Sequence, residues 1–432
     1  MAHLDESLTM HVAIIGGGYA GMAAAVTLAQ HGIKAALFEA AKTLGGRARR
    51  VMLNDTCLDN GQHLLLGAYS ETLRLVELVA PADTAWLRRP LQLHTLGGMQ
   101  LSAPYLPAPL NTLLALLGAR GLSASERFGA IRFMLAQRRS QFKLQQDISV
   151  ARLLAYHAQP AALVDKLWAP LCIAALNTPI AIASAQVFLN VLRDSLARRR
   201  SDSDLVFPAR DLSALFPQPA ADFVRTHGGT VTTGKTVEAI TQTAAGFSVN
   251  GAHYTHLICA VAPHQATRLL AGLDELDQVR ALINAFHYQP IATVYLQYPA
   301  QVLLAKPMLG LSGGLAQWVF DRGITHHQHG LLAVVISAEG HHRELAPQAL
   351  AQQVDAELRS ALGVLPAPHW HKVIVEKRAT YSCDAGLQRP DQLTALKNFY
   401  LAGDYTAGDY PATLEAATRS GVKCAQLILE QT

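Results

Sequence analysis

The chain has 432 residues, of which 50% are hydrophobic and only 16% are charged, and its formal net charge is +4. This composition excludes disordered, collagen-like and coiled-coil chains, and so small a charge gives no argument for nucleic-acid binding. The length predicts two or three domains with substantial hydrophobic cores.

The first forty residues predict a strand, a helix and a second strand. HVAII, at 11–15, is a short run typical of a buried strand, and IKAALF, at 33–38, predicts another. MAAAVTLAQH, at 22–31, predicts a helix of small residues that Gly32 ends. A strand–helix–strand unit of this size is the unit that binds dinucleotides in α/β folds.

The turn between the first strand and the helix has the spacing GxGxxG. Gly16 permits the tight turn, Gly18 lets the backbone approach a pyrophosphate, and Gly21 lets the helix pack closely on the strand. The helix start offers unpaired N–H groups to the phosphates. Glu39, after the second strand, can accept both ribose hydroxyls and would repel a 2′-phosphate, so the segment predicts dinucleotide binding.

A second glycine cluster, LGGRAR at 44–49, follows at once. Its position after the acid suggests a loop over the pyrophosphate, with Arg47 as a bidentate cation. The two motifs together resemble those of the FAD-containing amine oxidase and phytoene desaturase superfamily. The resemblance implies that FAD is the cofactor and that Gly45, Gly46 and Arg47 belong to its cradle.

The C-terminal region matches the closing motif of that superfamily. NFYLAGD, at 398–404, predicts a buried strand ending in Gly403-Asp404, and the last residues have helical spacing. The resemblance implies that Asp404 contacts the ribityl-phosphate region of FAD. It also implies that the backbone near Thr413 and Leu414 meets the pyrimidine edge of the flavin.

Two middle segments complete the predicted cofactor domain. Residues 228–240 predict a turn and two strands, and the resemblance implies that Val237 contacts the adenine through its backbone. Residues 256–263 predict a buried strand ending at Pro263. We therefore expect an α/β fold, a Rossmann-like FAD-binding domain of the GR2 flavoprotein type, with an inserted mixed α+β substrate domain. The expected FAD-binding parts are 11–75, 206–268 and 386–430, and the expected substrate-domain parts are 76–205, mostly helical, and 269–385, a sheet.

The inserted segments hold the candidate catalytic residues. The resemblance implies that 59–69 passes the flavin, with Gln62 in contact with the cofactor and His63 near the reacting atoms, although a lone histidine is more often structural. Residues 167–192 carry no charge and predict either a buried helical wall or a long apolar tunnel. In that run, Asn177 or Thr178 is a candidate for orienting a substrate hydroxyl.

A possible membrane contact lies at 105–139. Phe128, Ile131 and Leu135 share a helical face, basic residues flank them, and Ser125 is expected to cap the helix. A helix packed on its own domain explains the pattern equally well. The uncharged stretch 90–119 is broken by prolines, so no spanning helix is expected. The five cysteines lack metal-ligand or redox spacing, so we expect buried free thiols in a cytoplasmic protein. The basic, apolar segment at 105–139 adds the expectation of peripheral contact with the inner face of the bacterial membrane.

Five segments together resemble one subgroup of the superfamily: LGGRARR, LDNGQHLLLGAY, LWAPLCIAALNTP, EKRAT and NFYLAGDYTAGDYPATLEAATRSG. This subgroup is the squalene-associated FAD-dependent desaturases, the hydroxysqualene dehydroxylases of bacterial hopanoid pathways. The resemblance implies that hydroxysqualene loses water and takes a hydride from N5 of reduced flavin, yielding squalene. It implies as partners a C30 isoprenoid substrate, an electron-donor reductase and the synthases of squalene formation.

Three alternatives stay open from the sequence. A carotenoid-type desaturase would run the flavin in the oxidising direction, and an amine oxidase would need a smaller, aromatic-lined cavity. A prenyl-lipid escort protein would have lost the flavin-cradle residues that this chain retains. No metal site is predicted, because the histidines at 326–329 and 341–342 lack ligand spacing and are expected in a solvated loop.

Overall fold

A five-stranded parallel sheet positions the predicted cofactor site. The computed structural model describes residues 10–80 and 86–431, and the strand order in this sheet is β10-β2-β1-β14-β20. Its strands are β1 (Val12–Ile15), β2 (Ala35–Glu39), β10 (Thr230–Thr233), β14 (His256–Cys259) and β20 (Phe399–Leu401). The strands come from the start, the middle and the end of the chain, and their carboxyl ends share one edge, where ligands bind in open α/β sheets.

Alternate residues of β1 face two different hydrophobic cores, as the period of a strand requires. Val12 and Ile14 face the core made with helices α1 (Tyr19–Gln30), α10 (Pro217–Thr226) and α15 (Leu414–Leu429). Ala13 and Ile15 belong to the other core. That core includes residues of the antiparallel β11 (Ile240–Thr243), β12 (Gly246–Val249) and β13 (Ala252–Tyr254), and of helices α11 (Pro263–Leu269) and α12 (Asp277–Asn284). The parallel sheet is therefore covered on both faces.

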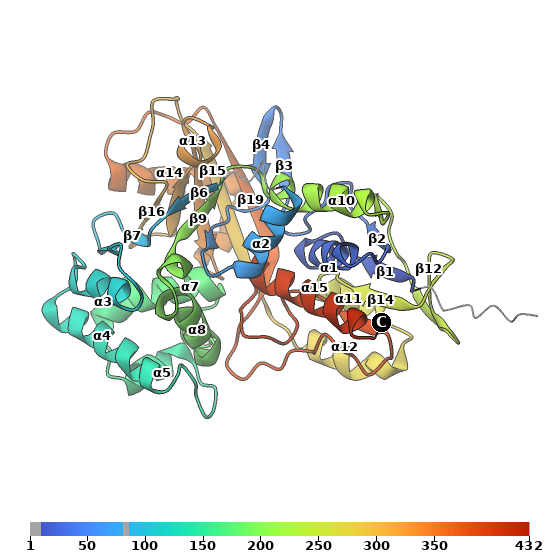
Figure 1. Cartoon of the computed structure of the whole chain (residues 1–432). Coiled ribbons are helices and arrows are strands. Elements are labelled where there is room, and N and C mark those ends of the chain that lie inside the picture. The colour runs from blue at the N-terminus through green and yellow to red at the C-terminus, as the bar shows by residue number, and fades with distance from the viewer. Residues whose placement is uncertain (1–9, 81–85, 432) are drawn as a thin grey trace, which may run out of the picture.

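Helices α1 and α15 lie side by side on the sheet (Figure 1). Every residue of α1 from Tyr19 to Ala29 is buried, which explains why this helix contains so many alanines. A Cβ atom at Gly421 of α15 would overlap the carbonyl oxygen of Ala20. The two helices can approach this closely only because α15 has glycine at that point.

A second five-stranded sheet lies in the other half of the molecule. Its order is β16-β17-β18-β15-β19, all antiparallel. The strands are β15 (Tyr288–Gln297), β16 (Met308–Gly310), β17 (Trp318–Asp321), β18 (Leu331–Ser337) and β19 (Trp370–Tyr381). Helix α14 (Pro347–Leu362) packs on this sheet, and β18 is buried along its whole length.

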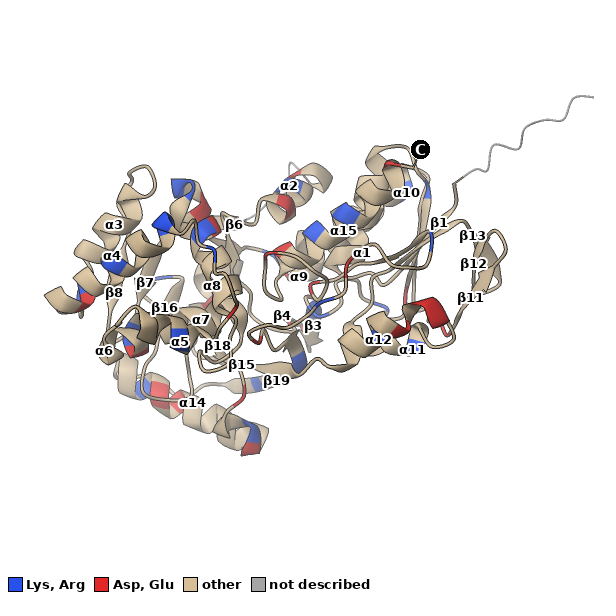
Figure 2. Ribbon diagram, turned by 90° about the horizontal axis from the view of Figure 1, so that it is seen from below, with Lys and Arg blue, Asp and Glu red and all other residues tan. Residues whose placement is uncertain are grey.

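The remaining elements are mostly short helices. Most of these helices lie at the end of the molecule opposite β12, as both ribbon views show (Figure 2). The helices are α2 (Ser70–Val79), α3 (Leu110–Leu117), α4 (Ala124–Arg139), α5 (Val150–Tyr156), α6 (Ala161–Leu163), α7 (Ala169–Leu176), α8 (Ala185–Leu192), α9 (Leu212–Leu215) and α13 (Arg322–His326). Of these, α2 and α9 lie nearer the parallel sheet, and α13 lies beside β18. The π-helical turns are η1 (Val164–Trp168) and η2 (Arg193–Ala197), and the 3-10 turns are η3 (Arg200–Ser203), η4 (Asp274–Leu276) and η5 (His341–Glu344). The small strands are β3 (Arg50–Leu53), β4 (Thr56–Asp59), β5 (Leu65–Leu66), β6 (Trp86–Arg89), β7 (Gln92–His94), β8 (Gln100–Ser102) and β9 (Leu205–Pro208).

Several local expectations need correction. Helix α4 begins at Ala124, and its cap is Ser123 rather than Ser125, because Ser123 and Glu126 form a reciprocal capping box. Residues 234–239 are not the second strand expected there; that strand starts only at Ile240. Four of the five cysteines are buried free thiols, as expected, whereas Cys57 is only half-buried. Within the described residues, no helix is both long and apolar enough to cross a membrane.

Candidate flavin and substrate site

The first glycine motif forms a turn that only glycine fits. Gly16 has a φ of +110°, and a Cβ atom there would lie 2.6 Å from the carbonyl oxygen of Ala260. A Cβ atom at Gly21 would overlap the carbonyl oxygen of Gly16. Helix α1 starts after Gly18 with no side-chain cap and no acidic residue in its first turn. Its first N–H groups are therefore left for an anion, as the sequence predicts.

Backbone N–H groups hold the carboxylate of Glu39 at the edge of this turn. Gly17 N–H donates to Oε2 at 2.6 Å, and Ala41 N–H donates to Oε1 at 2.7 Å. The loop 234–239 passes beside the same strand end, because the N–H of Lys235 donates to the backbone oxygen of Glu39 at 3.0 Å. That loop carries the buried Val237, so the two residues assigned to the adenosine half of FAD come from adjacent segments.

The second glycine motif folds directly onto the first. The N–H of Gly45 donates to the carbonyl of Gly17 at 2.9 Å, and Gly18 and Gly45 form an isolated bridge. Gly45 and Gly46 both have positive φ, at +118° and +61°. The two motifs therefore build one cradle with backbone on both sides, which the sequence suggested only by their order along the chain.

Arg47 connects the N-terminal and C-terminal motifs. Its guanidinium contacts Asp404 Oδ1 at 2.6 Å and the carbonyl oxygen of Ala379 on β19 at 2.7 Å. Burial lowers the pKa of Arg47, but the Asp404 and Glu376 carboxylates raise it by more, so the guanidinium stays charged. Asn60 adds a bond to the Arg47 carbonyl at 3.2 Å and one to Glu376 at 3.1 Å. Four distant chain segments thus converge on one point.

The closing motif forms the buried strand, the turn and the helix that the sequence predicts. Gly403 is anchored by Ser420, whose Oγ accepts its N–H at 3.0 Å. Thr413 is the N-cap of α15, because its Oγ1 accepts the N–H of Ala416 at 3.1 Å, so Leu414 is the first helical residue. The start of this second buried helix is therefore fixed without an acidic cap residue.

The residues present fit FAD. A side chain at Gly16 or Gly21 would collide with the backbone of the cradle. No side chain caps the start of α1, so its N–H groups can bind a phosphate. Tyr405, next to Asp404, is fully buried, and its hydroxyl has no hydrogen-bond partner among the described residues. A buried polar atom without a partner is unfavourable, so a polar group of the cofactor within reach would relieve it.

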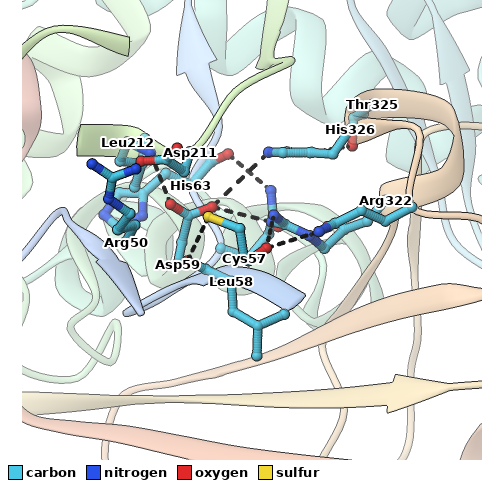
Figure 3. Close-up of polar contacts among 12 residues, drawn as sticks. Arg50, Cys57, Leu58, Asp59, His63, Asp211, Leu212, Arg322, Thr325 and His326 are labelled. Atoms are coloured by element: carbon cyan, nitrogen blue, oxygen red, sulfur yellow. Dashed lines mark hydrogen bonds and ion pairs between the residues drawn. The ribbon is translucent and has the colours of Figure 1, made fainter. Parts of the chain in front are cut away.

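A buried ion pair lies beside this site (Figure 3). Asp59 Oδ2 and Arg322 Nη1 are 3.1 Å apart, and the two residues are 2% and 1% exposed. The second carboxylate oxygen accepts the N–H of Leu212 at 2.8 Å. Burial raises the pKa of Asp59, and Arg322 and the Leu212 N–H oppose that rise. The pair joins strand β4 to helix α13, which packs on the second sheet.

Arg322 also binds Gln62. Its Nη1 donates to Gln62 Oε1 at 3.0 Å, while the Gln62 amide donates to the carbonyl of His63 at 3.2 Å. Both ends of the Gln62 side chain are therefore held by protein. This arrangement favours a positioning role for the side chain of Gln62 over the direct cofactor contact that the resemblance implies.

His63 follows Gln62 and is half-buried. Its Nδ1 lies 2.7 Å from the carbonyl oxygen of Gly61, so Nδ1 carries a hydrogen and Nε2 is the free end of the ring. Burial lowers the pKa of His63; the Gly61 carbonyl and Asp59 raise it, and Arg47 lowers it further. His63 is thus mostly neutral at pH 7, with a small imidazolium fraction.

The side chain of Asn177 is held by hydrogen bonds within the protein. It ends α7 in the left-handed conformation, with φ at +48°. Its Nδ2 donates to Thr380 Oγ1 at 3.0 Å and contacts two backbone oxygens of β15, and its Oδ1 accepts the N–H of Ala338 at 2.6 Å. Thr178 is also committed, because its Oγ1 accepts the N–H of Cys383 at 2.9 Å. These contacts argue against a role for either side chain in orienting a substrate hydroxyl.

The expectation of a solvated histidine loop is wrong for His326 and for His342, which is 4% exposed. The side chain of His326 is 6% exposed, and its Nε2 lies 3.9 Å from Asp59 Oδ2 without a hydrogen bond. His327 and His329 are exposed, as expected. Among residues 10–80 and 86–431, no group of three or more His, Cys, Asp or Glu is arranged to hold a metal ion.

His326 is expected to make folding stability depend on pH. Burial, with Arg322 second, lowers its pKa to about 3, whereas an unfolded histidine titrates near 6.5. The unfolded chain therefore binds the extra proton first. The contribution of His326 to stability is complete well above pH 6.5 and falls as the pH drops toward 3, by up to about 1.4 kcal/mol per pH unit.

Urea unfolding at pH 7.5, 6.5 and 5.5 measures this slope. His326→Gln should flatten it, and His329→Gln, an exposed neighbour, should leave it unchanged. Equal slopes for the wild type and His326→Gln would show that His326 is not the group that titrates.

Sequence reasoning missed Asp59, Arg322 and Glu415 as buried charged residues. Asp59 stands in a segment that attracted attention only for Gln62 and His63. Nothing near Arg322 in the sequence marks it, and its partner is 263 positions away. Glu415 is fully buried and accepts the N–H and hydroxyl of Thr72, which docks α2 on α15.

Comparison with protein families places the chain among known sequences. Residues 19–429 match the family model described as flavin containing amine oxidoreductase. A hydroxysqualene dehydroxylase of Rhodopseudomonas palustris is 30% identical, over 98% of this chain and 99% of that protein. A zeta-carotene desaturase of Synechocystis is 25% identical, over 97% of both chains.

The fold has close counterparts among solved structures. An oxidoreductase from Methanosarcina mazei superposes with a TM-score of 0.75 at 14% identity, covering 98% of this chain and 100% of that one. Identity this low supports a similarity of fold only. The Rossmann-like α/β fold expected from the sequence is confirmed.

Proposed function

Because the chain belongs to the flavin-containing amine oxidoreductase family and is an FAD-dependent oxidoreductase, we propose that it reduces hydroxysqualene to squalene. The observation that carries this proposal is the 30% identity to a hydroxysqualene dehydroxylase along nearly the whole of both chains. The zeta-carotene desaturase is less similar, at 25%. The retained Glu39, Arg47 and Asp404 oppose an escort protein that has lost its flavin.

The reaction needs a hydride, a proton and a dry site. FAD, when bound and reduced, supplies the hydride. The allylic carbon–oxygen bond of hydroxysqualene breaks, a carbon–hydrogen bond forms, and the hydroxyl leaves as water once it takes a proton. The protein must hold the cofactor, exclude water and provide that proton.

Glu39 and Arg47 carry out the first of these tasks. Glu39 faces the ribose end of the cradle, fixed by two backbone N–H groups. Arg47, neutralised in part by Asp404, places a guanidinium at the point where the cradle meets β19. A bidentate cation at this point suits a phosphate or a reduced, anionic ring.

His63 is our candidate for the proton donor. Its Nδ1 is committed to the Gly61 carbonyl, so only Nε2 could donate a proton to a substrate. The Asp59 carboxylate stabilises its imidazolium form, while burial keeps the pKa below the ordinary value. Because burial lowers the pKa of His63, the protonated ring is a better proton donor than an exposed imidazolium but is less populated, so turnover should rise as the pH falls.

The assay uses holoprotein reduced without oxygen and given hydroxysqualene. We expect squalene in a single turnover, identified by mass, together with reoxidation of the flavin absorbance. His63→Gln should lower the rate at least about 100-fold and remove the acid-side rise, because general acid catalysis contributes about that much. His264→Gln, a histidine outside the 59–63 segment, should retain the wild-type pH profile.

Other products identify the alternatives. A polyene with added double bonds from oxidised enzyme would establish the carotenoid-type desaturase. Peroxide released on addition of amines would establish an amine oxidase. If reduced holoprotein leaves hydroxysqualene unchanged, the proposed reaction is wrong.

Two partners follow from the proposed reaction. Each turnover leaves oxidised FAD, so we infer that a reductase returns the electrons. The substrate is too apolar to diffuse freely in water, so we infer that synthases of the squalene pathway deliver it directly or through the membrane.

A further inference from the structure

Helix α3 presents a row of leucines to solvent. Leu110, Leu114 and Leu117 are 54%, 43% and 41% exposed. Their spacing of four and three residues places them on one face of the helix. Residues of the opposite face, Thr112, Ala115 and Leu116, are buried. Single exposed leucines are ordinary, but three aligned on one helix form a continuous apolar surface.

Helix α4 packs beside α3 and extends this surface. Phe128 and Leu135 are 64% and 42% exposed, and they lie on the same face, seven residues apart. Arg132 and Arg139 occupy the positions between and beyond them, and both are exposed. We call the surface made by Leu110, Leu114, Leu117, Phe128, Arg132, Leu135, Arg138 and Arg139 the α3–α4 face.

Positive charge dominates around the α3–α4 face. Residues 103–143 contain six Lys and Arg but a single acid, Glu126. Glu126 is buried and bonded to Lys166 at 3.0 Å, so it does not offset the exposed arginines. Arg132, Arg138 and Arg139 form no ion pair with any described residue. An apolar surface rimmed by free cations matches an anionic lipid headgroup layer over hydrocarbon.

The position of the α3–α4 face suits a flat partner. Figures 1 and 2 both place α3 and α4 at one end of the molecule, away from the parallel sheet. A small, mostly apolar hollow of about 30 Å³ lies between the two helices. Its wall includes Pro109, Leu113, Met134, Leu135, Phe142 and Leu196. Most of this wall is side chains that a lipid tail can contact without losing hydrogen bonds.

We propose that the α3–α4 face docks onto an anionic phospholipid bilayer. The leucines and Phe128 enter the headgroup–acyl boundary, while the arginines stay at the level of the phosphates. The docking itself is independent of the proposed reaction, since it needs neither hydroxysqualene nor reduced flavin.

Vesicle flotation of the holoprotein tests the proposal. The probe is a vesicle of phosphatidylethanolamine with phosphatidylglycerol, compared with phosphatidylcholine vesicles. We expect flotation with the anionic vesicles only, weakening as salt increases. The triple variant Leu110→Ser/Leu114→Ser/Leu117→Ser should bind at least about tenfold more weakly. Arg132→Glu/Arg138→Glu/Arg139→Glu should weaken binding about 100-fold at low salt.

A matched control separates docking from general loss of apolar surface. Met52, Val364 and Leu393 are also highly exposed but lie outside α3 and α4, so replacing all three by serine should leave flotation unchanged. Flavin absorbance and the melting temperature report whether each variant is folded.

Three results would overturn the proposal. The first is a wild type that does not float with anionic vesicles, the second is a leucine variant that floats as the wild type does, and the third is a second copy of the chain bound at the α3–α4 face. In that last case, sedimentation would show a dimer that the leucine variant dissociates. Because these measurements omit the substrate, they fail or succeed separately from the squalene assay.

Discussion

Replacing Gly21 by valine is expected to give protein without bound FAD. A Cβ atom at this position would overlap the carbonyl oxygen of Gly16, so α1 must move away from the turn that forms the cradle. The affinity for FAD should fall more than about 100-fold, and stability by about 1–3 kcal/mol, the usual effect of overpacking a buried contact. Absorbance at 450 nm per protein and titration of apoprotein with FAD measure the first, and urea unfolding measures the second.

Gly408→Ala is the matched control. Gly408 lies in the loop after Asp404, close to the same site in the sequence, and a Cβ atom there meets nothing within 4 Å. Its FAD content should equal that of the wild type. Full flavin occupancy in Gly21→Val would mean that the cofactor does not depend on this turn.

The second large effect is expected at the buried ion pair. Arg322→Met leaves the Asp59 carboxylate buried without its partner, which should lower the free energy of unfolding by about 3–5 kcal/mol. Without the guanidinium the pKa of Asp59 rises further. A raised folded-state pKa means that the loss is largest at neutral pH and shrinks as the pH falls and Asp59 becomes protonated.

The Asp59→Leu/Arg322→Met double variant tests the cause of that loss. It removes both charges, so it should be more stable than Arg322→Met alone. Arg225→Met, at the exposed pair with Asp222, should change stability by less than about 1 kcal/mol. A double variant no more stable than Arg322→Met would show that lost packing, and not the buried charge, causes the effect.

The cofactor half of the fold could be predicted because its determinants are local. Gly16, Gly18, Gly21 and Glu39 lie within one strand–helix–strand unit, where spacing along the chain becomes spacing in space. The pairing of Arg47 with Asp404 could not be predicted, although both residues were identified, because 357 positions separate them.

The half of the molecule that contains the second sheet was harder to predict for the same physical reason. Asn177 stood out as a polar residue in an apolar run, but its amide serves the ends of neighbouring strands, which only the folded chain brings together. The α3–α4 region shows the opposite case. Its helical spacing predicted a shared face for Phe128 and Leu135, but not whether that face would be covered, and the structure leaves both exposed.

The packing of α15 on α1 also has a consequence for the synthesis of the chain. Helix α1 is translated more than 380 residues before α15, the helix that packs on it. At about 5–20 residues per second, α1 waits roughly 20–80 s for that partner. The side of α1 that faces α15, at Ala20 and Ala24, stays uncovered until then, so a chain released before residue 414 lacks this helix–helix contact. Such a fragment exposes apolar surface that chaperones and proteases recognise. Helix α15 is therefore needed to protect α1 from degradation.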